Sequence, residues 1–227
     1  MIGFYRFPHI PHMAWLGKDA PREDKVLAPW EVDKLLSSEV VVEKKLDGAN
    51  LGVSLDDMGG LQLQNRGQYL ARPFGGQFSR AGAWLGHHEA MLTNALGRDL
   101  ILFGEWCAAR HTVAYDNLPD WFIAFDVYER SSGRFWSVNR RNNWAAEVGL
   151  PNVPMLERRR ETAKELIATV TSTSSRFGAR PLEGVMIRQD SKEYLEQRAK
   201  LVRPEFTQSI GEHWRNRRIE WNSTGRQ

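Results

Sequence analysis

The stretch Glu43-Lys44-Lys45-Leu46-Asp47-Gly48-Ala49-Asn50 decides how this chain of 227 residues folds. It joins a β-prone run at residues 40–45 to a second one at residues 51–55 through the turn dipeptide Asp47-Gly48. A Gly-Gly turn then leads to a third run at residues 61–65. Short strands separated by such turns are typical of hairpins, so this spacing predicts an antiparallel meander.

Lys45 ends the first predicted strand, directly before the turn. Side chains alternate along a strand, so Glu43 and Lys45 share one face while Lys44 points to the other. A lysine held at this position can act as a nucleophile, but at an ordinary pKa of ~10.4 only about one in a thousand is neutral near pH 7.4. Nearby positive charge or desolvation has to lower that pKa. The alternative is a surface hairpin with solvated lysines.

The rest of the chain predicts an α+β fold. Residues 28–36 predict a short helix with Pro29 in its first turn, and residues 84–96 and 158–170 have helical periodicity. Apolar runs predict strands at residues 101–106, 121–128, 182–188 and 199–203. Strands in runs with helices between them favour antiparallel sheets flanked by helices.

Composition narrows the class of protein. Hydrophobic residues make up 41% and charged residues 26% of the chain, which excludes a disordered chain, and no apolar run reaches the roughly 18 residues of a membrane span. The single cysteine, Cys107, excludes an intrachain disulfide, and the N-terminus does not resemble a secretory signal, so we expect a cytoplasmic protein. The net charge of +3 permits polyanion binding.

Six segments in order resemble the motifs of the covalent nucleotidyltransferases, the superfamily of ATP-dependent ligases and capping enzymes, and within it the RNA ligase 2-like branch. The match runs from Lys45 to Arg203. The segments are Lys45-Leu46-Asp47-Gly48-Ala49-Asn50, Gln64-Asn65-Arg66-Gly67, Phe103-Gly104-Glu105-Trp106, the aromatic run at residues 122–128, Glu183-Gly184-Val185-Met186-Ile187-Arg188, and Lys200-Leu201-Val202-Arg203.

This resemblance implies a nucleotidyltransferase domain with an ATP pocket between its sheets. It implies that Lys45 takes the nucleotide, with Lys200 and Glu183 completing the catalytic set and Lys200 helping to lower the pKa of Lys45. Glu105 and Glu183 would hold magnesium or manganese. The implied ATP-binding residues are Glu43, Lys45, Asn50, Arg66, Glu105, Phe125 and Lys200, of which Phe125 would stack on the adenine, Glu43 would help recognise the base, and Arg66 would bind a phosphate.

The last motif departs from the family pattern, which often has a second lysine where this chain has Val202. Val202 shares the strand face of Lys200, and Arg203 points away. Either Arg203 reaches the pocket through a bulge, or Arg188 or another base supplies the missing charge.

The C-terminal region carries most of the basic excess. Phe206, Ile210, Trp214 and Trp221 follow helical spacing, so residues 206–227 predict a basic amphipathic helix or tail packed on a domain at residues 1–205. We expect no separate oligonucleotide-binding barrel. Such a helix either only closes the core or also contacts nucleic acid. The predicted nucleic-acid contacts are Arg203, Arg215, Arg217 and Arg218.

The resemblance implies an ATP-dependent RNA ligase that joins a 3′-hydroxyl to a 5′-phosphate through a lysyl-AMP intermediate and an adenylated 5′-end. Two alternatives stay open, a capping-type guanylyltransferase and a non-catalytic module that binds nucleic-acid ends. RNA ends, possibly in a nicked duplex, are the expected partners, and an end-healing kinase or phosphatase is a further one.

Overall fold

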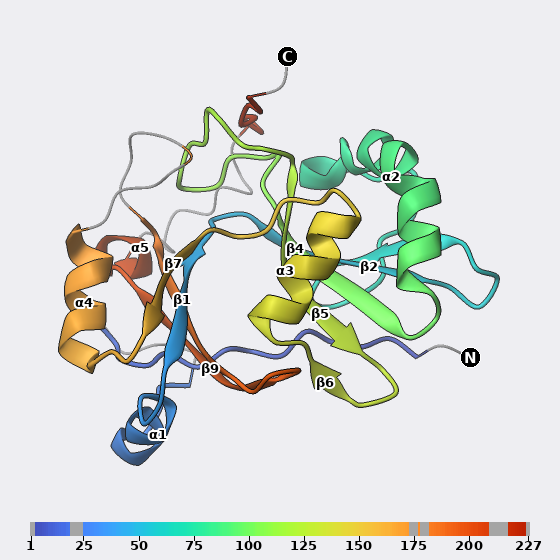
Figure 1. The fold of residues 1–227 in the computed structure, drawn as a ribbon. Helices are drawn as coiled ribbons and strands as arrows, with labels where there is room; N and C mark the ends of the chain where they lie inside the picture. Colours follow the sequence, from blue (N-terminus) through green and yellow to red (C-terminus); the bar gives the residue numbers. More distant parts are fainter. Residues whose placement is uncertain (1–2, 19–24, 173–176, 178–181, 209–217, 226–227) are drawn as a thin grey trace.

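A computed structural model describes residues 3–18, 25–172, 177, 182–208 and 218–225 (Figure 1). Within these residues the chain forms helices and strands in a mixed order. In sequence they are α1 Pro29–Leu35, β1 Val40–Lys45, β2 Ala49–Leu55, β3 Leu61–Gln64, the 3-10 helix η1 Gly76–Phe78, α2 Ala81–Leu96, β4 Leu100–Trp106, β5 Phe122–Glu129, β6 Arg134–Phe135, α3 Val138–Glu147, β7 Met155–Arg159, α4 Ala163–Ser172, β8 Gly184–Asp190, β9 Leu195–Val202 and α5 Pro204–Gln208.

The described strands form two antiparallel sheets. One has the order β7-β1-β8-β9 and the other β3-β2-β4-β5-β6. Figure 1 shows the first sheet beside α4 and α1, and the second beside α2. This confirms the predicted α+β class with antiparallel sheets flanked by helices.

The predicted meander is wrong at its first turn. β1 pairs with β7 and β8, whereas β2 pairs with β3 and β4, so the two strands belong to different sheets. A Cβ at Gly48 would lie 2.6 Å from the Trp106 carbonyl oxygen, so the turn packs against β4 as the chain crosses between sheets. Only glycine permits so close an approach. The predicted hairpin of β2 and β3 is confirmed.

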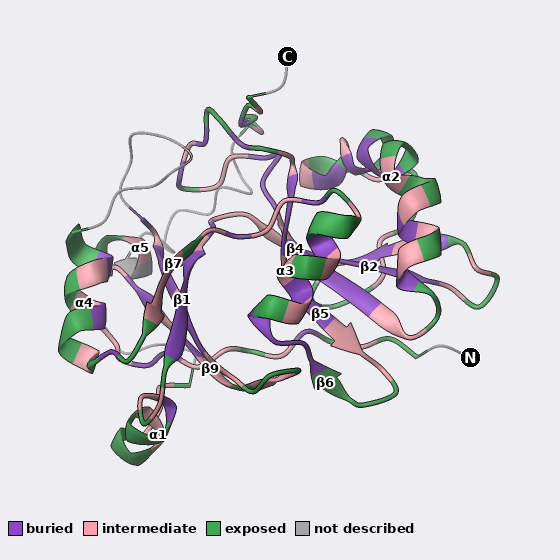
Figure 2. Cartoon of the chain, viewed as in Figure 1, coloured by how far each residue is buried: buried purple, intermediate pink, exposed green. Residues whose placement is uncertain are grey.

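Helices cover both sheets, and each sheet forms its own hydrophobic core with the helices that pack on it. Leu35 of α1 and Leu166 and Val170 of α4 are buried against Val40 and Val42 of β1. On the other sheet, the buried residues of α2, which include Trp84, Leu85, Leu92 and Leu96, pack against β2, β3 and β4. Figure 2 shows the strands largely buried while the helices keep an exposed face. Each sheet is thus covered by helices. The pocket described below is lined by strands of both sheets.

The helix predicted at residues 158–170 begins later than expected. Arg158 and Arg159 belong to β7 and pair with Val41 and Val40 of β1. The helix starts after Thr162, whose N–H donates to Glu165 Oε2 at 2.8 Å while Glu165 N–H donates to Thr162 Oγ1 at 3.3 Å. This reciprocal capping box sets the start of α4. The predicted helix at residues 84–96 and the short helix after Pro29 are confirmed.

Sequence reasoning missed α3. Ser137 caps it by accepting a hydrogen bond from Arg140 N–H at 3.3 Å. Its sequence, Val-Asn-Arg-Arg-Asn-Asn-Trp-Ala-Ala-Glu, is too polar to show an apolar stripe. The face turned inward carries Arg141, which is fully buried, in place of a hydrophobic residue.

Of the helix or tail predicted at residues 206–227, Phe206 lies in α5 and the end of the described chain is a packed segment without helix. Residues 218–225 are not helical, and Trp221 pairs with Ala109 in an isolated bridge. Asn222 holds this segment in place because its Nδ2 donates to Cys107 O at 2.7 Å and its Oδ1 accepts from Tyr115 N–H at 2.9 Å. Residues 209–217, with Ile210, Trp214, Arg215 and Arg217, lie outside the described residues. None of the described helices is long and apolar enough to cross a bilayer.

Candidate active site

A pocket of about 590 Å³ lies between the two sheets, which is a typical size for a small-molecule site. Both sheets contribute to its wall, through β1, β8 and β9 on one side and β2, β4 and β5 on the other. All the residues predicted to bind ATP line it. They are Glu43, Lys45, Asn50, Arg66, Glu105, Phe125 and Lys200.

Lys45 is held by an ion pair at the end of β1. Its Nζ lies 2.5 Å from Glu183 Oε1, although the two residues are 138 positions apart in sequence. β8 pairs with β1 so that Gly184 lies opposite Lys45, which places Glu183 directly beside the lysine. A Cβ at Gly184 would lie 2.3 Å from Leu201 O, so glycine is needed where β8 approaches β9.

Glu105 reaches the same point from the other sheet. Its Oε1 accepts a hydrogen bond from Gly48 N–H at 3.0 Å, and it pairs across the β2–β4 ladder with Asn50. Asp47 has a different task, because its Oδ2 accepts from Thr112 N–H at 2.7 Å and Val113 N–H at 2.6 Å. In this turn Asp47 therefore anchors the loop after β4, while the N–H of Gly48 holds the Glu105 carboxylate near Lys45.

Electrostatics in this cluster differ from the expectation for Lys45. Burial favours its neutral amine, but the negative charges of Glu183 and Glu105 outweigh that effect and raise the pKa of Lys45. Burial raises the pKa of Glu105 to about 8 and that of Glu183 to about 7, with Lys45 opposing both shifts. The predicted lowering of the lysine pKa is thus not a property of these side chains alone.

Lys44 points away from Lys45, as the strand alternation predicted. It is 1% exposed, and its Nζ lies 4.5 Å from the centre of the Phe177 ring and 5.3 Å from that of Tyr115. Burial lowers the pKa of Lys44 to about 8. The two neighbouring lysines therefore sit in different environments, one aromatic and one anionic.

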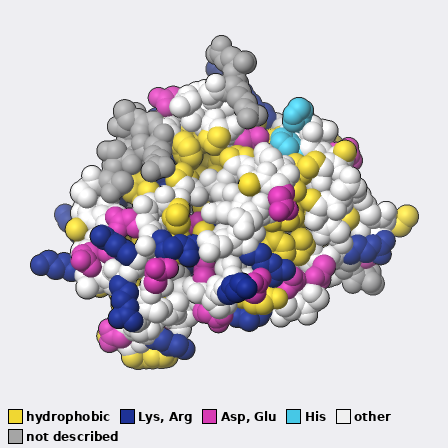
Figure 3. Space-filling view, viewed as in Figure 1, with side chains coloured by type: hydrophobic (Ala, Val, Ile, Leu, Met, Phe, Trp, Pro, Cys, Tyr) yellow, Lys and Arg dark blue, Asp and Glu magenta, His cyan; other side chains and the backbone are white. Residues whose placement is uncertain are grey.

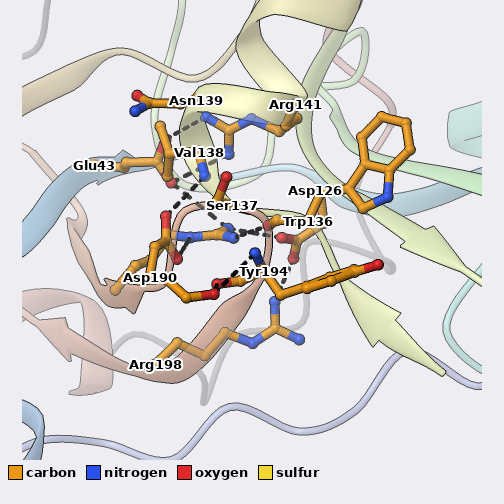
Figure 4. Close-up of polar contacts among 12 residues, drawn as sticks. Glu43, Asp126, Trp136, Ser137, Val138, Asn139, Arg141, Asp190, Tyr194 and Arg198 are labelled. Carbon is orange, nitrogen blue, oxygen red and sulfur yellow. Dashed lines mark hydrogen bonds and ion pairs between the residues drawn. The ribbon is translucent and has the colours of Figure 1, made fainter. Parts of the chain in front are cut away.

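Some of the residues that line the pocket belong to a network of buried ion pairs (Figure 4). Arg141 of α3 donates from Nη2 to Glu43 Oε1 at 2.5 Å and from Nη1 to Phe125 O at 2.5 Å. Asp126 accepts from Arg188 Nη1 at 2.6 Å and also from Arg198. Glu43 lines the pocket as predicted, but its carboxylate is already paired with Arg141, a residue that the sequence did not single out.

The structure settles part of the question raised by Val202. Val202 is buried, and Arg203 does not line the pocket, because its Nη1 donates to Val170 O and Thr171 O at the end of α4. The proposed bulge at Arg203 is therefore wrong. Arg188 does line the pocket, but its guanidinium is committed to Asp126, Phe125 O and Trp136 O. Arg218 is exposed and does not line the pocket.

Sequence reasoning missed a polar pair at the rim of the pocket. His111 and Gln77 both line it, and His111 Nε2 lies 2.8 Å from Gln77 Oε1. The signal that could have found His111 is its place in the loop directly after β4, since site residues often follow the ends of strands.

The carboxylates next to Lys45 fit a divalent cation that arrives with a nucleotide. Within the described residues, no group of three or more His, Cys, Asp or Glu side chains is arranged to hold a metal ion. Mg²⁺, however, is usually bound by one or two carboxylates together with substrate phosphates and water. Glu183 Oε2 and Asn50 Oδ1 are buried and have no hydrogen-bond partner in the described chain, so they offer free oxygen atoms.

Comparison with known proteins gives the family. A family model described as RNA ligase matches residues 38–202, which is more than half of the chain. The chain belongs to the RNA ligase family. The match includes Lys45, Glu105, Glu183 and Lys200 and ends at Val202. A search of curated proteins gave no match.

Solved RNA ligases have the same fold. An RNA ligase of Naegleria gruberi with PPi has a TM-score of 0.62 and 18% identity over 79% of this chain and 54% of its own. A lysine-to-alanine mutant of that ligase with ATP and Mn has a TM-score of 0.63 and 16% identity, and the match covers 78% of this chain and 53% of the mutant's chain. An archaeal ATP-dependent RNA ligase has a TM-score of 0.61 and 21% identity over 89% and 49%. Our RNA ligase-family chain spans about half the length of these proteins.

Proposed function

We propose that this protein is an ATP-dependent RNA ligase of the RNA ligase 2-like type. The observation that carries the proposal is Lys45 Nζ at the pocket, 2.5 Å from Glu183 Oε1, with Glu105, Arg66 and Lys200 around the same cavity. Family membership supports RNA as the substrate, and the Naegleria ligase with ATP and Mn supports the nucleotide and metal. A cytoplasmic location and an end-healing kinase or phosphatase as partner are part of the proposal.

Three displacements at phosphorus make up the proposed reaction. Lys45 Nζ attacks the α-phosphorus of ATP, a P–N bond forms, and the bond to the β-phosphate oxygen breaks to release pyrophosphate. An oxygen of an RNA 5′-phosphate then attacks the same phosphorus and frees the lysine. Finally, a 3′-hydroxyl attacks the 5′-phosphate and AMP leaves. Splitting the condensation in this way replaces one difficult step by easier ones.

The side chains of the pocket hold the reacting groups in position. Lys45 has to lose a proton before it attacks, and its contact with Glu183 Oε1 at 2.5 Å holds the amine at the pocket for that step. Arg66 and Lys200 are positioned to hold phosphate oxygens. Phe125 lines the pocket with its ring against Phe7, at 5.4 Å between centroids, and offers a surface for the adenine.

Glu105 and Glu183 are the residues that would hold the magnesium or manganese ion. When bound, the ion supplies charge neutralisation for the transferring phosphoryl group. Protonated carboxyls bind cations poorly, so metal binding at these residues has to displace protons.

We therefore expect the magnesium requirement to depend on pH. Burial raises the pKa of Glu105 to about 8 and of Glu183 to about 7, so both become carboxylates only as the pH rises through that range. The magnesium concentration that half-saturates lysyl-AMP formation should fall between about pH 6 and about pH 8. Excess magnesium should shift the pH–rate profile to lower pH. A half-saturating concentration that stays constant across this range would contradict the assignment.

Incubation with α-labelled ATP or GTP and RNA ends tests the function. We expect ATP, but not GTP, to label the protein, and the labelled protein to seal RNA ends carrying a 3′-hydroxyl and a 5′-phosphate. Labelling by GTP alone would indicate a capping-type enzyme, and RNA binding without labelling would indicate an end-binding module. Matched nicked duplexes and single strands with RNA or DNA at the 3′ side define the substrate.

A further inference from the structure

An N-terminal arm at residues 3–7 runs beside the pocket with alternating exposure. Phe7 is buried and lines the pocket, and Tyr5 stacks on Tyr128 at 3.7 Å between ring centroids. The Tyr5 carbonyl accepts a hydrogen bond from Gln64 Nε2 at 2.8 Å, which ties the arm to β3. Phe4 and Arg6 are exposed, so the arm is anchored by one set of side chains and presents the other to solvent.

Arg6 lies beside the turn that carries Arg66. One Nη atom of Arg6 is 3.9 Å from the position that a Cβ would take at Gly67. Asn65 shapes this turn, because its Oδ1 accepts from Gly67 N–H at 2.8 Å and Gln68 N–H at 2.9 Å. Arg66 is exposed and lines the pocket. Two exposed arginines thus lie at this turn, of which Arg66 lines the pocket.

The structure describes no acidic partner for either arginine. Among the residues that the structure describes, no carboxylate forms an ion pair with Arg6 or Arg66. Phe4 adds an aromatic ring that is 38% exposed and packs edge-on against Tyr69 at 5.1 Å between centroids. Positive charge combined with an exposed aromatic ring is the pattern of single-stranded nucleic-acid binding.

The paired arginines of β7 do not share these properties. On β7, Arg158 lies 3.8 Å from Glu39, and Arg159 lies 2.8 Å from Glu157 and 2.7 Å from Glu161. Figure 3 shows acidic side chains among the basic ones over this side of the molecule. The charge there is largely balanced, so the arm is the better candidate for contact with a polyanion.

We propose that Arg6 and Phe4 bind the single-stranded RNA that follows the 5′-phosphate end. Arg6 contacts a phosphodiester next to the 5′-phosphate held at Arg66, and Phe4 stacks on the adjoining base, which is possible because unpaired bases expose their faces. This inference rests on the proposed RNA ligase function. It adds a substrate contact on the N-terminal arm to those that the sequence predicts in the C-terminal region.

Binding of a short 5′-phosphorylated single-stranded RNA, measured by fluorescence anisotropy at several salt concentrations, tests the proposal. We expect Phe4→Ala to weaken binding about tenfold. Arg6→Gln should weaken it several-fold and reduce the salt slope by about 0.7, the value for one phosphate contact on a single strand. Phe4→Trp should retain binding because it restores the stacking surface.

Matched measurements separate this proposal from the proposed function. Arg160→Gln, at an exposed arginine after β7, should bind RNA like the wild type. Lysyl-AMP formation from ATP alone should be unchanged in every variant, which shows that the pocket is folded. If the wild type adenylates Lys45 and seals RNA while Arg6→Gln and Phe4→Ala bind RNA as it does, only the inference about the arm is overturned. A wild type that forms no lysyl-AMP overturns the proposed function instead.

Discussion

Replacing Lys45 with alanine is expected to abolish the protein–AMP adduct, lowering its rate of formation by a factor of about 10³ or more. Lys45 Nζ is the amine that faces the pocket, with Glu183 at 2.5 Å and Glu105 close by. Its loss leaves Glu183 without the amine that it contacts, and Lys200, the other lysine near this carboxylate, is expected to hold phosphate oxygens rather than to accept AMP. Mass spectrometry of the protein after incubation with ATP and magnesium measures the adduct directly.

Lys44→Met is the matched control for this variant. Lys44 is the preceding residue, but its Nζ lies against the rings of Tyr115 and Phe177 rather than against the carboxylates. Methionine fills a similar volume in this aromatic environment. We expect the adduct to form in Lys44→Met and to be absent in Lys45→Ala. An adduct that persists in Lys45→Ala and disappears in Lys44→Met would reverse the assignment of the nucleophile.

The Lys45→Ala protein should still act on an RNA whose 5′-end already carries AMP. The lysine takes part in the first two displacements, and the attack of the 3′-hydroxyl does not need it. Sealing of pre-adenylated RNA by Lys45→Ala, without ATP, therefore distinguishes loss of the nucleophile from collapse of the pocket. Failure to seal this substrate, while the wild type does, would indicate structural damage.

The pairing of Lys45 with Glu183 shows what the sequence could predict. Each motif contains a residue with specific chemistry: Lys45 at the end of a strand, and Glu183 beside a glycine. The alternation of side chains along the strand predicts which face of the sheet each residue lies on. The contact itself joins residues 138 positions apart. Local pattern does not encode such a pairing, so the assignment of β1 and β2 to different sheets could not be predicted from their turn.

Arg141 shows why another part of the site could not be predicted. Sequence patterns treat arginine as a surface residue, and Arg141 lies in a polar helix that periodicity does not detect. Its burial depends on partners from two other elements, Glu43 of β1 and the Phe125 carbonyl of β5. Sequence reasoning identified Glu43 as a pocket residue, but it did not identify Arg141, which forms the ion pair with the Glu43 carboxylate.

Arg141→Met should destabilise the protein by about 3 kcal/mol, at the low end of the usual cost of breaking a buried ion pair, because Glu43 keeps only the longer pair with Arg188 at 3.8 Å. The side chain of Arg141 is 0% exposed and that of Glu43 is 2% exposed, so water cannot replace the lost contact. Phe125 O also loses the shorter of its two side-chain hydrogen bonds and keeps the one from Arg188 Nη1 at 3.2 Å, and we expect a higher KM for ATP because the Phe125 strand is less firmly held. Urea unfolding and adenylation kinetics measure the two effects.

Two further variants distinguish ion-pair loss from general damage. Arg140→Met removes the neighbouring arginine, which pairs with Glu129 at 2.7 Å but is 29% exposed, and should cost no more than about 1 kcal/mol. Glu43→Gln combined with Arg141→Met removes both buried charges and should cost less than the sum of the two single variants. If Arg141→Met were as stable as Arg140→Met, or if the double variant were simply additive, the pair would not be what holds α3 against the wall of the pocket.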